Sequence, residues 1–118
     1  MDQDELKLIL ELRTQFVQDL DDDLLNCEDQ LMEFEKSQNE ESLNECLRIL
    51  HSSKGTSSYL ELPTLSKYLH DLEHMINQTK EAKNIDLCLD YIGKIRNNIN
   101  LINLQSAEDF PEISKLAG

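Results

Sequence analysis

The sequence contains no tryptophan and has little proline, glycine or aromatic content: two prolines, three glycines and 5% aromatic residues among 118. Sheet-forming chains are usually richer in aromatic residues and in the glycine and proline of tight turns, so this composition argues against a β-rich fold. Its apolar residues are largely leucine and isoleucine, and 30% of all residues are charged. We therefore expect one all-α domain spanning residues 1–118.

Long apolar runs are also missing, and none approaches the length needed to cross a bilayer. The first residues are acidic, so they lack the positively charged region of a secretory signal, and they also lack its apolar region. Basic residues are few: the net charge is −13, and residues 1–45 hold 15 acidic against 3 basic side chains. Nucleic acid and membrane surfaces are therefore not expected partners. Cys27, Cys46 and Cys88 show no CxxC spacing and fall at apolar positions, which indicates buried thiols and a cytoplasmic location.

Apolar residues recur at alternating steps of three and four, the pattern of amphipathic helices that pack in a bundle. The first seam, interrupted only by a basic residue, runs through Leu6, Leu10, Arg13, Val17, Leu20, Leu24, Cys27, Leu31 and Phe34. After a polar break at residues 37–39, a second helix should turn inward Leu43, Cys46, Leu47, Leu50 and Ser57. We expect a monomer, although the first seam also suits a dimer interface.

Two further helices complete the pattern. Pro63 suits the first turn of the third, whose inward positions are Leu65, Tyr68, Leu69, Leu72, Met75 and Ile76. The fourth has its seam at Ile85, Cys88, Ile92, Ile95, Ile99 and Ile102. A short fifth helix is expected to use Phe110, Ile113 and Leu116. The sequence thus predicts an up-down four-helix bundle with a short C-terminal helix.

The residues that suggest chemistry lie in the second helix, around His51. A neutral imidazole can accept a phosphoryl group, and Lys54, one turn later, can balance the added charge. Gly55 leaves room for a close approach by another molecule. On a helical wheel, His51, Gly55 and Ser58 line up away from the apolar side, so this stripe should be exposed to partners.

A histidine that attacks phosphorus needs one unprotonated ring nitrogen and a partner that holds the proton on the other. Glu73, on the third helix, is the candidate for that partner, because two antiparallel helices with a short connection can bring it beside His51. His70 shares the face of Glu73 and is expected to join the hydrogen-bond network. Lys54 is expected to stabilise the phosphoryl oxygens.

The segment from Leu47 to Glu73 resembles the histidine phosphotransfer (HPt) domain, and most of all the version at the N-terminus of chemotaxis-type histidine kinases. That family has a His-x-x-Lys-Gly-[Ser/Thr] motif followed on the next helix by His-x-x-Glu. Both are matched here, together with three of the family's apolar positions, by His51, Lys54, Gly55, Thr56, Leu60, Leu65, His70, Leu72 and Glu73. The similarity extends more weakly over the remaining helices.

The resemblance implies that His51 accepts a phosphoryl group from ATP on a histidine kinase catalytic domain, or from the aspartate of a receiver, and passes it to the aspartate of a response-regulator receiver domain. The chain would be a carrier without autonomous catalysis, either free-standing or the first domain of a larger kinase. It has no phosphate-binding loop, so Mg²⁺ and ATP should come with the partner. Two positions depart from the family: Ser53 replaces a usual leucine, and Glu61 stands where glycine is common.

Two other functions fit parts of the sequence. His70, Glu73 and His74 match the H-x-x-E-H pattern of inverted zinc peptidases, in which two histidines bind zinc and the glutamate is the general base. Such a site needs a third ligand, and Glu81, Glu108 and Glu112 are poor candidates on so short a chain. A helical adaptor that binds through its apolar seams and is never phosphorylated is the other alternative.

Overall fold

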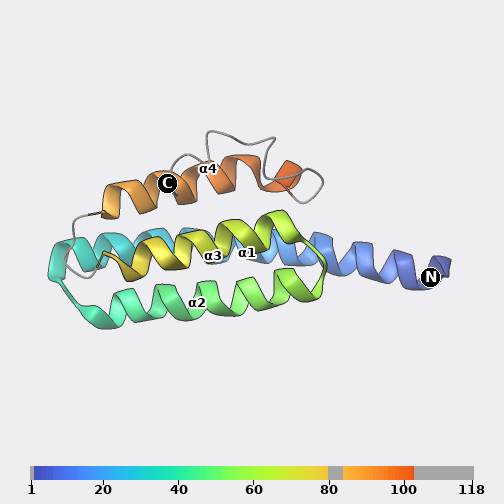
Figure 1. Ribbon diagram of the computed structural model, residues 1–118, viewed down its shortest axis with the longest axis horizontal. Helices are drawn as coiled ribbons and strands as arrows, with labels where there is room; N and C mark the ends of the chain where they lie inside the picture. The colour runs from blue at the N-terminus through green and yellow to red at the C-terminus, as the bar shows by residue number, and fades with distance from the viewer. Residues whose placement is uncertain (1, 80–83, 103–118) are drawn as a thin grey trace.

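The computed structural model describes residues 2–79 and 84–102, with side chains described up to residue 99 in the last helix. Four helices follow one another: α1 (Gln3–Ser37), α2 (Glu40–Tyr59), α3 (Pro63–Asn77) and α4 (Ile85–Ile102). They lie side by side and alternate in direction (Figure 1). The all-α fold and the up-down order of four helices are therefore confirmed. The predicted fifth helix, with Phe110, Ile113 and Leu116, lies outside the described residues.

Short polar residues set where the helices begin. Asp2 caps α1 by accepting a hydrogen bond from the Glu5 backbone N–H at 2.8 Å. Asn39 does the same for α2, accepting from the Glu41 N–H at 3.0 Å. These side chains satisfy backbone donors that have no partner inside the helix. α3 starts at Pro63, whose fixed φ suits a first helical turn, as predicted.

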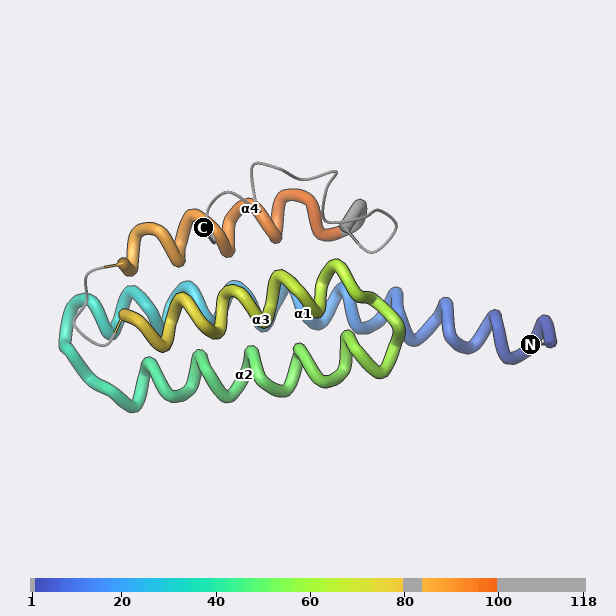
Figure 2. The backbone as a smooth tube through the Cα atoms, viewed as in Figure 1, coloured from blue at the N-terminus to red at the C-terminus, as the bar shows by residue number. Residues whose placement is uncertain are grey.

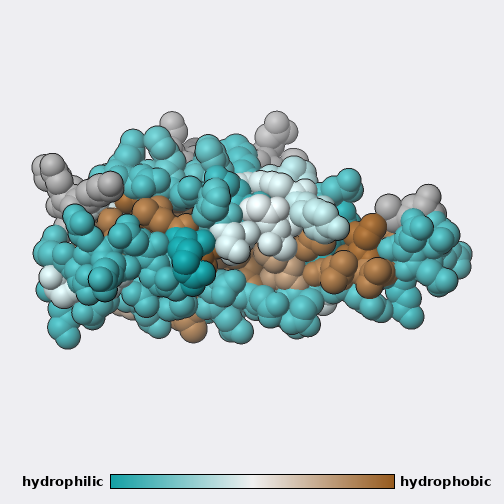
Figure 3. All heavy atoms as spheres, turned by 90° about the horizontal axis from the view of Figure 1, so that it is seen from below, coloured by the Kyte–Doolittle hydropathy of each residue, from teal (hydrophilic) through white to brown (hydrophobic). Residues whose placement is uncertain are grey.

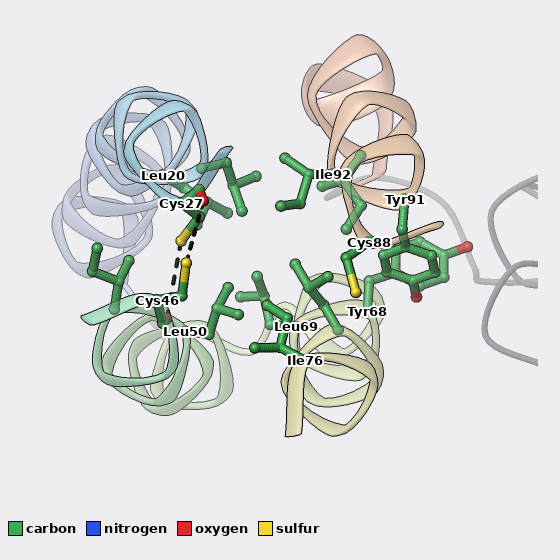
Figure 4. Close-up of a cluster of buried hydrophobic side chains, with 14 of the residues drawn as sticks. Leu20, Cys27, Cys46, Leu50, Tyr68, Leu69, Ile76, Cys88, Tyr91 and Ile92 are labelled. Carbon is green, nitrogen blue, oxygen red and sulfur yellow. Dashed lines mark hydrogen bonds between the residues drawn. The ribbon is translucent and has the colours of Figure 1, made fainter. Parts of the chain in front are cut away.

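The core runs along the bundle and is built from all four helices (Figure 4). The seam predicted for α1 is buried from Val17 onward, and every inward position predicted for α3 is buried. In α2, Ser53 and Ser57 are buried with the apolar residues, while Leu47 is only partly buried against the core. Tyr91 and Ile49 are buried positions that periodicity did not predict. The ring of Tyr91 packs edge-on against Tyr68, with centroids 6.2 Å apart.

The three cysteines are free and buried, as predicted. Cys46 donates its S–H to the carbonyl of Cys27 at 3.2 Å, joining α2 to α1. Contact with the Cys46 thiol and burial raise the pKa of Cys27, and burial raises the pKa of Cys88 to about 12. Cys27 and Cys88 therefore serve as small apolar side chains and not as nucleophiles.

The beginning of α1 departs from the prediction. Leu6 and Leu10 were expected to face the core, but they are 48% and 51% exposed. The reason is that α1 extends past the turn between α2 and α3, so its first turns have no helix beside them among the described residues (Figures 1 and 2). Arg13 marks the boundary, because its Nε donates to the carbonyl of Leu60 in that turn at 2.8 Å.

A polar contact closes the opposite side of the bundle, between α4 and α1. Arg96 donates to Asp21 at 3.0 Å and to Glu28 at 3.4 Å. Both acids lie on the strongly acidic helix α1, so Arg96 offsets part of its charge where the two helices meet. Within the described part of the chain, no helix is both long enough and apolar enough to cross a membrane.

Candidate functional site

His51 lies on α2 and points away from the core. Its neighbours Leu50 and Ser53 are buried, whereas the His51 side chain is 75% exposed. The difference follows from the helix itself, in which each residue turns about 100° from the last. The ring is therefore fixed on a rigid element and open to solvent, in the orientation expected from the sequence.

Glu73 reaches His51 from the adjacent helix α3. Its Oε1 lies 3.8 Å from Nδ1 of His51, and the Glu73 side chain is only 21% exposed. This distance is longer than a hydrogen bond, but such contacts often tighten when the reacting complex forms. The carboxylate therefore lies on the Nδ1 side of the ring and leaves Nε2 on the opposite edge.

Lys54 contacts the other oxygen of the same carboxylate. Its Nζ lies 3.1 Å from Glu73 Oε2, an oxygen that is buried and has no hydrogen bond of good geometry. The ion pair thus compensates a charged atom that water does not reach. Lys54 thus forms an ion pair with Glu73, whereas the sequence suggested only that Lys54 would contact phosphoryl oxygens.

His70 does not join this group. Among the described residues it makes no hydrogen bond or ion pair with His51 or Glu73, and its side chain is exposed. It lies instead on the wall of an open groove of about 680 Å³ that begins beside Lys54 and runs between α2 and α3. The expected part of His70 in the hydrogen-bond network is therefore not seen in this state.

The groove is lined mainly by small or polar residues. Gly55 and Ser58 come from α2, and Ser66, Lys67 and His70 come from α3. A Cβ atom added at Gly55 would meet nothing within 4 Å, so this glycine opens onto free space. Figure 3 shows the corresponding face with a pale, nearly neutral area. Gly55 and Ser58 of the exposed stripe therefore line a hollow that a partner can enter.

Two polar groove residues, Ser66 and Lys67, were not singled out by the sequence. Ser66 forms a hydrogen bond with Ser58 across the two helices at 2.7 Å. Lys67 contacts Asp71 on its own helix at 2.7 Å and also lines the groove. Glu61 lines the same groove at the turn. The position of Glu61, just before α3, did give a signal in the sequence.

The two departures from the HPt pattern have clear structural places. Ser53 is 5% exposed and occupies a core position. Glu61 has a φ of 58°, a left-handed conformation that glycine adopts without strain and other residues avoid. The turn therefore keeps the backbone shape that a glycine would favour, although a glutamate occupies it.

Thr56 and His74 have local partners. Thr56, the last residue of the motif, donates its hydroxyl to the Ser52 carbonyl within α2 at 3.2 Å. His74 contacts the Gln78 side chain at 3.2 Å. Across residues 2–79 and 84–102, no three His, Cys, Asp or Glu side chains are grouped as a metal site would need. The possible third zinc ligands Glu81, Glu108 and Glu112 lie outside those residues.

The comparison with known families agrees with this geometry. The family described as the Hpt domain matches residues 11–107, which is most of the chain. No solved structure matches the chain. The matched region contains the exposed histidine, the glutamate beside it and the groove. The chain therefore belongs to the Hpt domain family and is a histidine phosphotransfer module.

Proposed function

We propose that Nε2 of His51 is the atom that accepts and releases the phosphoryl group. The observation that supports this most strongly is the combination of an exposed His51 ring and a glutamate on its Nδ1 side, at 3.8 Å. Glu73 favours the tautomer in which Nδ1 holds the proton, so that Nε2 keeps its lone pair for attack.

The reaction is a phosphoryl exchange at a single nitrogen. The Nε2 lone pair attacks the γ-phosphorus of ATP, or the phosphorus of a receiver's aspartyl phosphate, and an N–P bond forms. The P–O bond to ADP or to the carboxylate breaks, and its electron pair leaves with that oxygen. The proton on Nδ1 stays in place and bonds to Glu73. For onward transfer, an aspartate oxygen attacks phosphorus and the N–P electron pair returns to Nε2.

Lys54 is proposed to act in two ways during this cycle. Before transfer it holds Glu73 through the 3.1 Å contact. When the phosphoryl group adds negative charge one helical turn away, Lys54 can swing toward those oxygens, because a lysine stem is flexible and its ammonium is a compact charge. Its ion pair with Glu73 thus places a cation next to the reacting ring.

The partners are proposed to be the catalytic domain of a histidine kinase and the receiver domain of a response regulator, in the cytoplasm. The groove beside Lys54 gives such a partner an entry next to His51, with Gly55 and Ser58 as docking positions. We propose that the module transfers phosphoryl groups only with such a partner, which supplies ATP and Mg²⁺. His70, on the groove wall, is a contact for the partner.

The three histidines of the chain allow a direct test. The whole protein is incubated with phosphoramidate, a small phosphoryl donor, and phosphohistidine is measured by ³¹P NMR as an acid-labile, base-stable signal. His51→Gln should abolish the signal. His70→Gln and His74→Gln, which remove the other two imidazoles, should keep it. Phosphorylation that survives His51→Gln would reject the proposal.

A further inference from the structure

The first turns of α1 expose a concentration of leucine that the site does not use. Leu6, Leu8, Leu10 and Leu12 are 48%, 56%, 51% and 45% exposed, and we call these four residues the leucine tip. The helix here projects beyond the rest of the bundle (Figure 1), and Figure 3 shows apolar surface toward this end of the molecule. At about 100° per residue, Leu6 and Leu10 share the face that continues the core seam of α1, whereas Leu8 and Leu12 point to other sides of the helix. Exposed apolar side chains on a face that continues a core seam usually mark an interaction site.

Most of the leucine tip is additional to the shared bundle. The match to the Hpt domain family begins at residue 11, so Leu6, Leu8 and Leu10 precede it. The tip also lies apart from the phosphotransfer site. Because α1 and α2 are antiparallel and Arg13 contacts Leu60, His51 lies about two turns of helix deeper into the bundle than that contact. An interaction at the tip therefore leaves the histidine open.

We propose that the leucine tip pairs with the same tip of a second copy of this chain, to form a weak twofold dimer. A second helix end with the same apolar face fits the projecting helix along its length, with Leu6 and Leu10 of each copy in the contact. In an antiparallel pair, Leu6 and Leu10 of one copy interleave with those of the other. The face that lacks a neighbour in one molecule gains one in the pair.

The charges beside the leucines are arranged for such a pairing. Lys7 and Glu11 are four residues apart, so they lie on the same flank of α1, where both line one hollow together with Leu10. In an antiparallel twofold pair, equal flanks of the two helices face each other, because the axis that relates the copies reverses one of them. Lys7 of each copy then comes within reach of Glu11 of the other.

The size of the tip sets the strength of the dimer. About ten residues of helix span about 15 Å, with a width of about 10 Å. Such a pair covers much less than the roughly 800 Å² per partner of a standard stable interface. The net charge of −13 on each copy also opposes association. We therefore expect reversible pairing that depends on protein concentration and becomes tighter as salt screens the repulsion.

Sedimentation equilibrium of the whole protein tests the proposal. At about 0.5 M salt the average mass should rise with concentration from 13.7 kDa toward twice that value, and it should rise less at about 0.05 M salt. Leu6→Asp and Leu10→Asp should each weaken pairing at least about tenfold, because each buries a charge in the contact. Leu25→Asp is the matched control, since Leu25 is 44% exposed on the same helix but lies away from the tip; it should leave pairing unchanged.

A charge-exchange cycle tests the antiparallel arrangement. Lys7→Glu alone should weaken the dimer, and Lys7→Glu combined with Glu11→Lys should restore it, because the second change recreates the facing pair with its charges reversed. Circular dichroism checks that each variant keeps its helices. All these positions are exposed, so the variants should fold.

Three outcomes would overturn the proposal. The first is a mass of one chain at every concentration and salt level. The second is association that Leu6→Asp and Leu10→Asp both leave unchanged, which would place the contact away from the tip. The third is a Leu10→Asp variant that is monomeric like the parent but much less stable to urea, which would show that the chain's own residues cover the tip.

Discussion

Residues 51–59 of α2 and residues 3–12 of α1 are both exposed stretches of helix, but their surfaces are opposite in kind. The first presents one histidine among serine, threonine and glycine and ends at the exposed Tyr59, and a Cβ at Gly55 would meet open space. The second presents four leucines that are each about half exposed. Small side chains around His51 let a partner approach closely, whereas leucines favour lasting contact. The proposed place of reaction is thus separate from the proposed place of association.

The largest expected effect compares two leucines of α1. Leu24→Ala should destabilise the fold by about 2–5 kcal/mol, because Leu24 is fully buried and its loss leaves a cavity. Leu10→Ala should change stability by less than about 0.5 kcal/mol, as is usual for a surface position. Urea unfolding followed by circular dichroism at a low protein concentration measures both. Equal losses of stability would mean that Leu10 is packed against other residues in solution.

The next effect concerns the acid beside His51. Glu73→Ala should slow phosphoryl uptake about 10- to 100-fold, the usual cost of losing a group that orients a reactive histidine. Stability should fall by less than about 1 kcal/mol, because its ion pair with Lys54 is partly exposed. Initial rates with a kinase domain and ATP provide the measurement. Asp71→Ala, which removes another carboxylate from α3, is the control and should keep the parental rate.

A third change should have opposite effects on stability and on phosphoryl transfer. Gly55→Leu should raise stability by about 0.5–1 kcal/mol, because glycine is a poor helix former. It should also slow transfer to a receiver about tenfold, since the new side chain projects into the space that a docked partner would fill. Thermal unfolding and transfer rates are measured together. Gly93→Ala on α4 should stabilise the fold without slowing transfer; slowing by both changes would contradict a local docking role.

The smallest effect tests the turn that lies between the two exposed stretches. Glu61→Gly should stabilise the protein by up to about 1 kcal/mol, because it relieves the left-handed φ of 58° at this residue. The contact with Arg13 that it removes is long, at 3.8 Å, and largely exposed, so its loss costs little. Glu61→Ala removes the same carboxylate but keeps a Cβ, and it should give no such gain. Urea midpoints distinguish the two.

The order and faces of the helices could be predicted because periodicity determines which side of a helix is buried. It does not determine where the neighbouring helices end, and for that reason Leu6 and Leu10 were wrongly expected in the core. Arg13 was the signal of that boundary: a basic residue in an apolar seam, bonded in the structure to the carbonyl of Leu60. The interruption of the apolar seam by Arg13 was visible in the sequence, but the carbonyl group to which Arg13 donates was not.

The candidate site was also predictable in part. The motif and helix phase identified His51 and its outward direction. Glu73 was the candidate partner because two antiparallel helices with a short connection could bring it beside His51, and the resemblance pointed to the same residue. The contact between Lys54 and Glu73 was not predicted, because the distance between two helices depends on how far each slides along the other. For the same reason the place of His70 on the groove wall, away from Glu73, could not be obtained from spacing alone.

If His51 carries the phosphoryl group as proposed, the exposure of its ring, 75% in the free protein, also sets how long that group can remain there. No described residue covers the ring, so water could reach the N–P bond, and hydrolysis would compete with transfer from the moment the bond formed. The phosphorylated histidine would therefore be hydrolysed even without a partner. How much of a signal survives depends on how soon a receiver arrives, and the abundance of that receiver becomes part of the output.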